Sequence, residues 1–297
     1  MIKTSLFADQ KREAKLNKLG DALRVSEQHV DFAVEFQLFD RLSVQRFVGL
    51  RASSQIPDQT TIWTFKERLI QAGASESIFE AVNRQLSRHG YIARGGQMID
   101  ASIVQTPRQS LSGEEKALVS EGAMPADWKP AKRRQKDMDA RWAKKHGKSY
   151  FGYKVSANAD NRYKLVRKIK VSTASEHDTT HFEDVLDPAN TNRNILADKG
   201  YIDSEREVRL GQQGWRMHIQ RKGSKDKPIS DTQQLRNRRI AKTRARIEHV
   251  FAGLAQMGGK ALRSIGLSRA TLHLNWKVAA YNLQRLVYLK EARVEAF

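Results

Sequence analysis

The sequence predicts an α/β protein with an all-helical N-terminal part, and three observations support this fold class. Apolar residues recur at helical spacing over residues 16–90, where β-rich segments are nearly absent. Short β-rich segments begin after Gly95-Gly96. From Asp178 onward, predicted helices and strands alternate, which is typical of parallel strands joined by crossover helices. The length of 297 residues suits about two domains, and we expect them at residues 1–92 and 93–297.

The N-terminal region is predicted to form short amphipathic helices. Their apolar faces are Leu16, Leu19 and Leu23; Ile62, Phe65 and Leu69; and Ile78, Val82 and Leu86. Ser43 and Asp58 are suitable N-caps for two of these helices. Two short helices around a polar connection are compatible with a helix-turn-helix that reads DNA and equally with an ordinary helical bundle, so both interpretations stay open.

The remainder of the chain is predicted as follows. Strands are expected at residues 98–104, 150–157, 164–171, 194–197 and 215–220, and helices at residues 178–186, 204–210, 232–256 and 271–289. The second and third strands form a hairpin. The polar and basic stretch of about residues 105–149 is expected to be an extended surface insertion.

Positive charge is concentrated in two segments. The chain has 53 Lys and Arg against 33 Asp and Glu, a net charge of +20. Residues 129–154 contain ten basic and two acidic residues, and residues 216–249 contain eleven and three. Such blocks are typical of phosphate-binding surfaces, although solvated helix faces are an alternative. The residues that we expect to contact DNA are Lys132, Arg133, Arg134, Lys148, Lys154, Lys242, Arg244 and Arg246.

Composition excludes several other classes of protein. The chain has no cysteine, which removes disulfide frameworks, thiolate zinc sites and cysteine catalysis. No run of 18 apolar residues and no apolar signal core are present, so we expect a soluble cytoplasmic protein with no membrane partner. His177 and His181 have the spacing of a zinc pair but lack an evident third ligand, and Asp178 is better explained as a helix cap.

Two other local patterns are set aside for similar reasons. Gly147-Lys148-Ser149 lacks the earlier glycine of a phosphate-binding loop, because Trp142 occupies that position, so no ATP site is predicted. Trp128, Trp142 and Trp215 are able to stack on a base, but packing in the core or at its rim is the simpler expectation.

Three carboxylates carry the candidate chemistry. Asp100 lies within a buried-looking strand, and Asp198 follows another. Glu248 lies beside an apolar helical face and is the one acidic residue in the basic helix predicted at residues 232–256. Two strands and one helix that each supply a carboxylate can hold two Mg²⁺ ions for chemistry at a phosphodiester. As alternatives to a metal site, Asp198 simply ends a strand, and Glu248 forms an ordinary ion pair with Arg244.

Together these residues resemble the DDE transposases of bacterial insertion sequences. The similarity includes Asp100, Ala197-Asp198-Lys199-Gly200-Tyr201 and Arg244-x-x-x-Glu248. It extends to the stretches at residues 57–65, 146–154 and 275–283, and thus covers most of the chain. Relatives often carry Tyr and Lys where this chain has Ala241 and Ala255, so the roles of those two positions do not carry over.

The resemblance implies a ribonuclease-H-like mixed sheet flanked by helices. It places Asp100 on the first strand, Asp198 at the end of the fourth, and Glu248 on the helix after the fifth. All three would be both catalytic residues and metal ligands, with Mg²⁺ as the cofactor and Mn²⁺ as a substitute.

The function that the resemblance implies is metal-dependent cleavage at terminal inverted repeats, followed by transfer of a 3′-hydroxyl to target DNA. The protein would act on the nucleoid as a homodimer or larger assembly when it pairs two DNA ends. A structure-selective nuclease on the same fold and a DNA-binding regulator are the alternatives.

Overall fold

The computed structural model of the chain describes residues 58–145, 147–224 and 228–296. These residues belong to two compact units. The first contains the described residues up to Gly73 together with Leu283–Glu295, and the second extends from Ala74 to Asn282 and includes residue 296. The division therefore precedes the boundary near residue 92 that the sequence predicts. The predicted helices before residue 58, including the helix capped by Ser43, lie outside the described residues.

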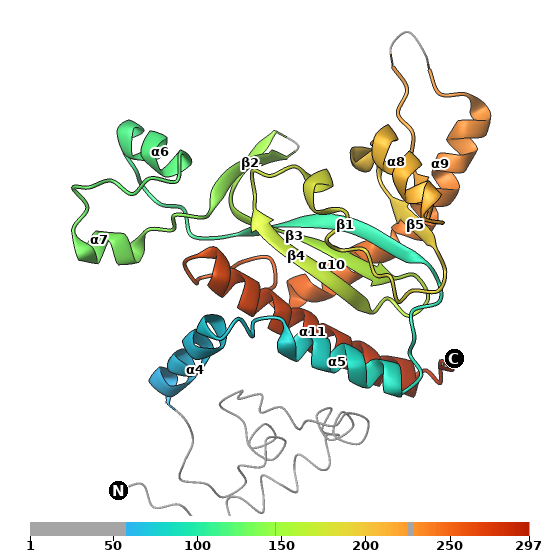
Figure 1. Cartoon of the computed structure of the whole chain (residues 1–297), viewed down its shortest axis with the longest axis horizontal. Coiled ribbons are helices and arrows are strands. Elements are labelled where there is room, and N and C mark those ends of the chain that lie inside the picture. The colour runs from blue at the N-terminus through green and yellow to red at the C-terminus, as the bar shows by residue number, and fades with distance from the viewer. Residues whose placement is uncertain (1–57, 146, 225–227, 297) are drawn as a thin grey trace, which may run out of the picture. The chain divides into compact units, whose positions relative to one another are not determined.

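A six-stranded mixed sheet forms the centre of the second unit (Figure 1). Its strands are β1 (Gln97–Gln105), β2 (Arg141–Lys145), β3 (Lys148–Asp160), β4 (Val166–Thr173), β5 (Asn194–Ala197) and β6 (Arg216–Ile219). β1 pairs antiparallel with β3 and parallel with β5, and β6 continues in parallel beyond β5. β2 and β4 both pair with β3. This arrangement confirms the predicted strands, the parallel crossovers and the ribonuclease-H-like fold class.

The described helices, with short 3₁₀ turns labelled η, are α4 (Gln59–Gln71), α5 (Ser77–Arg88), α6 (Gly113–Ser120), α7 (Pro130–Gln135), η1 (Asp178–His181), η2 (Lys199–Tyr201), α8 (Ser204–Gln212), α9 (Asp231–Arg244), α10 (Arg246–Gln256) and α11 (Leu267–Glu291). Asp58 caps α4 as predicted, because its side chain accepts from the Thr61 N–H at 2.7 Å. In the described ranges, no helix combines the length and the apolar character needed to cross a membrane.

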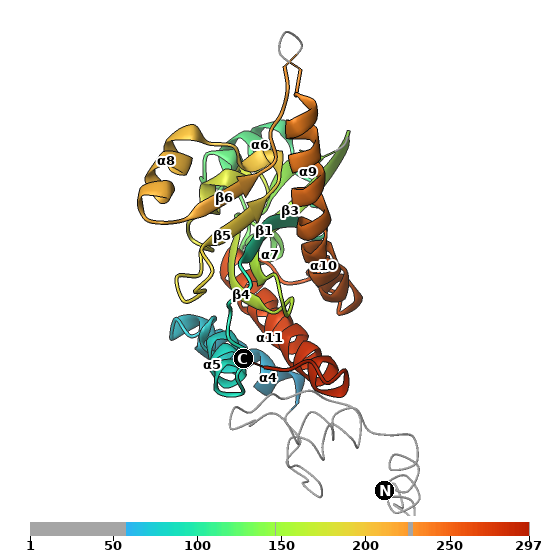
Figure 2. The same ribbon diagram turned by 90° about the vertical axis from the view of Figure 1, so that its right-hand side faces the viewer.

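One buried apolar cluster determines which way the strand side chains face. It contains Ile99 of β1, Ile195 and Ala197 of β5, Ile219 of β6 and Leu210 of α8, together with Phe182 and Tyr201. α8 covers this face of the sheet, and α9 lies on the opposite face (Figure 2). Side chains alternate along a strand, so the residue that follows each of Ile99 and Ala197 is directed toward the α9 face.

Three sequence-based expectations are corrected by the structure. The stretch at residues 178–186 forms only the 3₁₀ turn η1, because Phe182 and Val185 both turn into the buried cluster. The helix predicted at residues 232–256 is divided by a turn at Ala245 into α9 and α10. α9 packs on β5 and β6, whereas α10 packs on β1, so tertiary packing directs the two halves differently.

The third correction concerns the insertion at about residues 105–149. It contains α6, α7 and the strand β2, and the two helices lie beyond the sheet (Figure 1). A capping box formed by Ser112 and Glu115 starts α6, and Trp128 Nε1 donates to Glu115 Oε1 at 2.7 Å. The sequence did not predict β2, because the lysines of this strand obscure the alternation of apolar and polar residues. Lysines are common on exposed edge strands.

Asn282 joins α11 to the edge of the sheet and is fully buried. Its Oδ1 accepts from the Val166 N–H at 2.9 Å, and its Nδ2 donates to the Val166 carbonyl at 2.7 Å and to Asn83 Oδ1 at 3.0 Å. Asn282→Ala should lower the free energy of unfolding by about 2–3 kcal/mol, since it leaves buried backbone groups unpaired. Urea denaturation measures this loss. Asn275→Ala is the control, because Asn275 donates only within its own helix, and an equal loss there would contradict the assignment.

Candidate active site

The two aspartates predicted from the sequence are brought together by the pairing of β1 with β5. Gln97 lies opposite Ile195, and Met98 lies opposite Leu196. The same register, continued by two residues, brings Asp198 beside Asp100 just beyond the end of β5. Both aspartates are directed toward the α9 face, because Ile99 and Ala197 face the apolar cluster. Asp198 also caps η2, where its Oδ1 accepts from the Gly200 N–H at 2.8 Å.

Arg244 connects the third carboxylate to the first. Its Nη1 donates to Asp100 Oδ2 at 2.7 Å, and its Nη2 lies 3.7 Å from Glu248 Oε1. Arg244 is the last residue of α9, and Glu248 lies in the first turn of α10. The turn at Ala245 therefore places both side chains next to β1. Glu248 is the most exposed of the three carboxylates, with 66% of its side chain accessible.

The Asp100 carboxyl lies in a strongly perturbed electrostatic environment. Burial raises its pKa above the ordinary value, and the nearby negative charge of Asp198 raises it further. The Arg244 guanidinium, the Ala101 N–H and the Lys145 ammonium act in the opposite direction without reversing the shift. A carboxyl that is costly to ionise in the folded protein would gain from a bound cation.

This perturbation predicts how the stability of Asp100→Asn depends on pH. Because the pKa of Asp100 is raised in the folded protein, its carboxyl stabilises the folded state fully at pH values below the ordinary pKa of 3.8. This stabilisation is lost as the pH rises through the pKa of Asp100 in the folded state. Asn cannot ionise, so the thermal midpoint of Asp100→Asn minus that of the wild type should increase from pH 4 to pH 7. Calorimetry in EDTA measures this difference.

Asp203→Asn is a control of opposite sign. Hydrogen bonding to the Arg206 backbone N–H, the largest cause, lowers the pKa of Asp203. Its contribution to stability is present above 3.8 and lost as the pH falls. Below about pH 4, the midpoint of Asp203→Asn minus that of the wild type should therefore decrease with rising pH, and it should stay nearly constant from pH 4 to pH 7. A flat difference for Asp100→Asn would contradict the role of burial.

Several charged and polar residues lie near the aspartates, and the sequence did not predict this proximity, although it named Lys154 as a DNA contact. Lys145, in the basic β2 strand, acts electrostatically on Asp100. Lys154 is buried on β3 and forms an ion pair with Asp178 Oδ1 at 2.6 Å. Tyr201 lies in η2 with its hydroxyl buried. The short sequence distance of Tyr201 from Asp198 was the one available signal, and the others depend on how distant strands pair.

The predicted DNA-contacting residues occupy different environments. Arg134, Lys148, Lys242 and Arg246 are exposed. Arg246 nevertheless donates to the backbone and side-chain oxygens of Asn161 at 3.2 Å. The remaining members bond within the protein: Lys132 to Glu115, Arg133 to the Trp128 carbonyl, Lys154 to Asp178, and Arg244 to Asp100.

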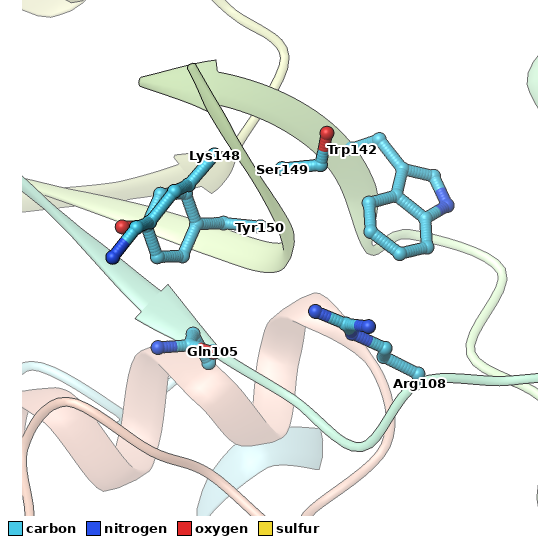
Figure 3. A pocket seen from close by; sticks show the side chains of 6 residues that line it. All are labelled: Gln105, Arg108, Trp142, Lys148, Ser149 and Tyr150. Carbon is cyan, nitrogen blue, oxygen red and sulfur yellow. The ribbon is translucent and has the colours of Figure 1, made fainter. Parts of the chain in front are cut away.

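A pocket of about 590 Å³ lies beside the β2–β3 hairpin (Figure 3). Lys148 and Tyr150 line one side, and Trp142 and Arg108 line the other. The Arg108 guanidinium lies 5.6 Å from the centre of the Trp142 ring, and Trp142 is 47% exposed. Trp128 and Trp215 are buried, which confirms core packing for those two. This surface combines an exposed aromatic ring with positive charge.

His177 of the histidine pair lines a second pocket beside the same hairpin. This pocket, of about 410 Å³, is also lined by Trp142, Lys145 and Lys154 and by the rest of residues 174–178. His181 bonds to the carboxylates of Glu176 and Asp184. Within the described ranges, no three or more His, Cys, Asp or Glu side chains are gathered closely enough to hold a metal ion, and this applies both to the histidine pair and to Asp100, Asp198 and Glu248 as they lie in this structure.

A ribonuclease-H-like sheet with Asp100 on β1, Asp198 just after β5 and Glu248 on α10 is the arrangement expected of a protein of the DDE class. The family model described as "Transposase DDE domain" matches residues 94–283, and the chain therefore belongs to this family. The match includes Asp100, Asp198 and Glu248. It confirms the resemblance seen in the sequence.

The chain is similar to the "Transposase for insertion sequence element IS1106" of Neisseria meningitidis serogroup B. The two chains are 30% identical over 196 residues, which cover 64% of this chain and 65% of the relative. The matched part thus spans just under two thirds of that transposase. No solved structure matches the chain.

Proposed function

We propose that the protein is a DNA transposase that cleaves the ends of its element and transfers the freed 3′-hydroxyl to target DNA. The observation that carries this proposal is that the parallel pairing of β1 with β5 brings Asp198, just after β5, beside Asp100 of β1, with Glu248 connected to Asp100 through Arg244. Membership of the DDE transposase family and the similarity to the IS1106 transposase support it.

The donor set suits a hard divalent cation. Carboxylate oxygens are the ligands that Mg²⁺ prefers, and Mn²⁺ accepts the same donors. Asp100, Asp198 and Glu248 would hold the cation, which when bound would activate the attacking oxygen and stabilise the leaving oxygen. The raised pKa of Asp100 fits this role, because a second positive charge beside Arg244 would favour the ionised carboxylate.

Both proposed reactions are in-line substitutions at phosphorus. In cleavage, a water oxygen forms a bond to phosphorus while the bond to the 3′-oxygen breaks, and the 3′-oxygen leaves with a proton. In strand transfer, that 3′-hydroxyl loses its proton and attacks a target phosphodiester, whose 3′-oxygen is displaced. Because both steps need the same alignment, one set of carboxylates can serve both.

The exposed basic residues would bind the DNA backbone. Lys148 and Arg108 lie beside the exposed Trp142, and aromatic rings near cations are common on surfaces that contact nucleic acids. We place the protein on terminal inverted repeats and target DNA, in the cytoplasm at the nucleoid. Pairing of two ends would require a dimer or larger assembly.

A strand-transfer assay tests the proposal. Purified full-length protein is incubated with Mg²⁺ or Mn²⁺ and a labelled duplex that carries the sequence flanking the gene. Labelled DNA joined to a second duplex is the expected product. Cutting without joining would instead support a structure-selective nuclease, and binding with neither reaction would support a DNA-binding regulator.

The salt dependence of DNA binding gives a second prediction. Each neutralised phosphate contributes about −0.9 to the slope of log K against log salt. Lys148→Ala and Lys242→Ala should each make the slope shallower by roughly one unit, as measured by fluorescence anisotropy. Lys170→Ala removes an equal charge outside both basic segments and should leave the slope unchanged. Equal slopes for all three variants and the wild type would contradict the assigned surface.

A further inference from the structure

The pocket of about 590 Å³ beside the β2–β3 hairpin differs in charge from the pocket that contains His177. Two cations, two aromatic rings and two neutral polar side chains line it: Arg108 and Lys148, Trp142 and Tyr150, Gln105 and Ser149 (Figure 3). None of these six described residues is acidic. The pocket with His177 instead includes Glu176 and Asp178, and Asp178 already pairs with Lys154. The positive charge of the hairpin pocket is therefore not balanced by its own lining.

Trp142 is anchored to the sheet but remains exposed. Its ring packs against the ring of Phe151, with the centroids 5.3 Å apart, and Phe151 is buried. Trp142 keeps 47% of its surface exposed, although tryptophans are highly buried on average. A large ring that is fixed in place and open to solvent is typical of a surface that binds a partner.

The two cations of the pocket are free to turn toward a ligand. Arg108 and Lys148 are exposed, and within the described ranges neither side chain forms an ion pair. The Arg108 guanidinium lies 5.6 Å from the centre of the Trp142 ring, and Lys148 lies beside Tyr150 (Figure 3). An anionic group bound near Trp142 would thus meet a cation from each side of the pocket.

A nucleotide combines the two features that this lining suits, a flat base and a charged phosphate. Bases stack on aromatic side chains, and cations bind the phosphate. Within a duplex each base is covered by its neighbours, so only an unpaired base offers its face to a ring. Gln105 lies five residues beyond Asp100 on β1, or roughly 17 Å at about 3.4 Å per residue. A nucleotide in this pocket would therefore lie away from the phosphodiester that reacts.

We propose that the hairpin pocket binds one unpaired nucleotide of the DNA, with its base stacked on Trp142 and its phosphate held by Arg108 and Lys148. This inference rests on the proposed transposase function for the choice of DNA as the ligand. A single-stranded end and a base turned out of the duplex both supply such a nucleotide, and the chemistry of binding is the same.

Fluorescence anisotropy with a labelled single-stranded oligothymidine tests the stacking contact in the full-length protein. Trp142→Ala should weaken binding about 10-fold, because the stacking of a base on the ring is lost. Trp142→Phe keeps a ring, so its loss should be less than about 3-fold. Equal affinity of Trp142→Ala and the wild type would overturn the proposal.

Tyr288→Ala is the matched control. Tyr288 is 54% exposed and has the Arg285 guanidinium 4.4 Å from the centre of its ring, but it lines neither of the two pockets. Its loss should leave the affinity for the oligothymidine unchanged. An equal loss for Tyr288→Ala and Trp142→Ala would show that any exposed aromatic ring beside an arginine is sufficient, and it would overturn the assignment to this pocket.

Photocrosslinking of the wild-type protein needs no variant and also identifies the source of the nucleotide. 5-Iodouracil replaces one thymine at a time, either within an intact duplex that carries the flanking sequence or in a single-stranded tail on that duplex. We expect a crosslink to Trp142 or Tyr150, identified by mass spectrometry. A crosslink from the intact duplex indicates a base turned out of the helix, and one from the tail alone indicates a strand end.

The crosslinking result separates the two proposals. If neither substrate crosslinks to Trp142 or Tyr150 while strand transfer proceeds, the pocket assignment is overturned and the proposed function stands. If the crosslink forms but no DNA is cut or joined, the proposed function is overturned and the nucleotide pocket stands.

Discussion

Asp100→Asn, Asp198→Asn and Glu248→Gln are each expected to lower the rates of strand cleavage and strand transfer by at least about 10³-fold, or ~4 kcal/mol of activation free energy. Each substitution keeps the size of the side chain and removes one negatively charged oxygen donor. Both reactions depend on the same donors, so cleavage and joining should fall together. Single-turnover assays in Mg²⁺ measure both rates on one labelled substrate.

The control for these variants is Glu114→Gln. Glu114 lies exposed in the first turn of α6, so its substitution removes the same charge away from the carboxylates. Its rates should match those of the wild type. DNA binding by the three active-site variants should be retained, since none of them removes a basic residue. Near-normal joining by any one of the three would remove that residue from the proposed catalytic set.

Arg244→Ala should shift the pH dependence of cleavage as well as lower its rate. The Arg244 guanidinium lowers the pKa of Asp100, so its loss raises that pKa and reduces the ionised fraction of Asp100 at any given pH. The acid limb of the pH–rate profile should therefore move to higher pH. At pH 7 we expect a loss of about 10²-fold, or ~2.7 kcal/mol.

Arg244→Lys separates charge from geometry. Lysine keeps the positive charge but cannot contact Asp100 and Glu248 through two nitrogens of one planar group. Arg244→Lys should therefore return the acid limb of the pH–rate profile most of the way to its wild-type position, and it should restore only part of the cleavage rate. Arg238→Ala removes a positive charge from an exposed position on α9 and should weaken DNA binding without moving the limb. An unmoved acid limb in Arg244→Ala would contradict the electrostatic role of Arg244.

Local sequence pattern was sufficient for much of the fold. Alternating apolar residues predicted β1, β3 and β4, and the strand at residues 194–197 was predicted with its observed bounds. These elements are recognisable because each buries one face or lies wholly within the core, which requires a regular apolar pattern. The insertion was less predictable, since β2 is stabilised by pairing with β3 and not by its own composition.

The candidate site is divided in the same way between sequence and structure. Asp100, Asp198 and Glu248 could be named from the sequence because each is an acid beside an apolar strand or helix face, where a charge requires a partner. The identity of that partner was not predictable. Asp100 and Arg244 are separated by 144 positions in the chain, and they meet only because the turn at Ala245 directs α10 onto β1.

The sequence by itself determined the α/β class, the order of the main strands, the concentration of basic charge and the three carboxylates. Those features depend on residue type and on spacing within one element. Only the tertiary structure decided that Arg244 pairs with Asp100, that Lys154 is held by Asp178, and that Trp142 lies exposed beside Arg108. These properties depend on which strands and turns pack against one another, and the packing of the whole core determines that.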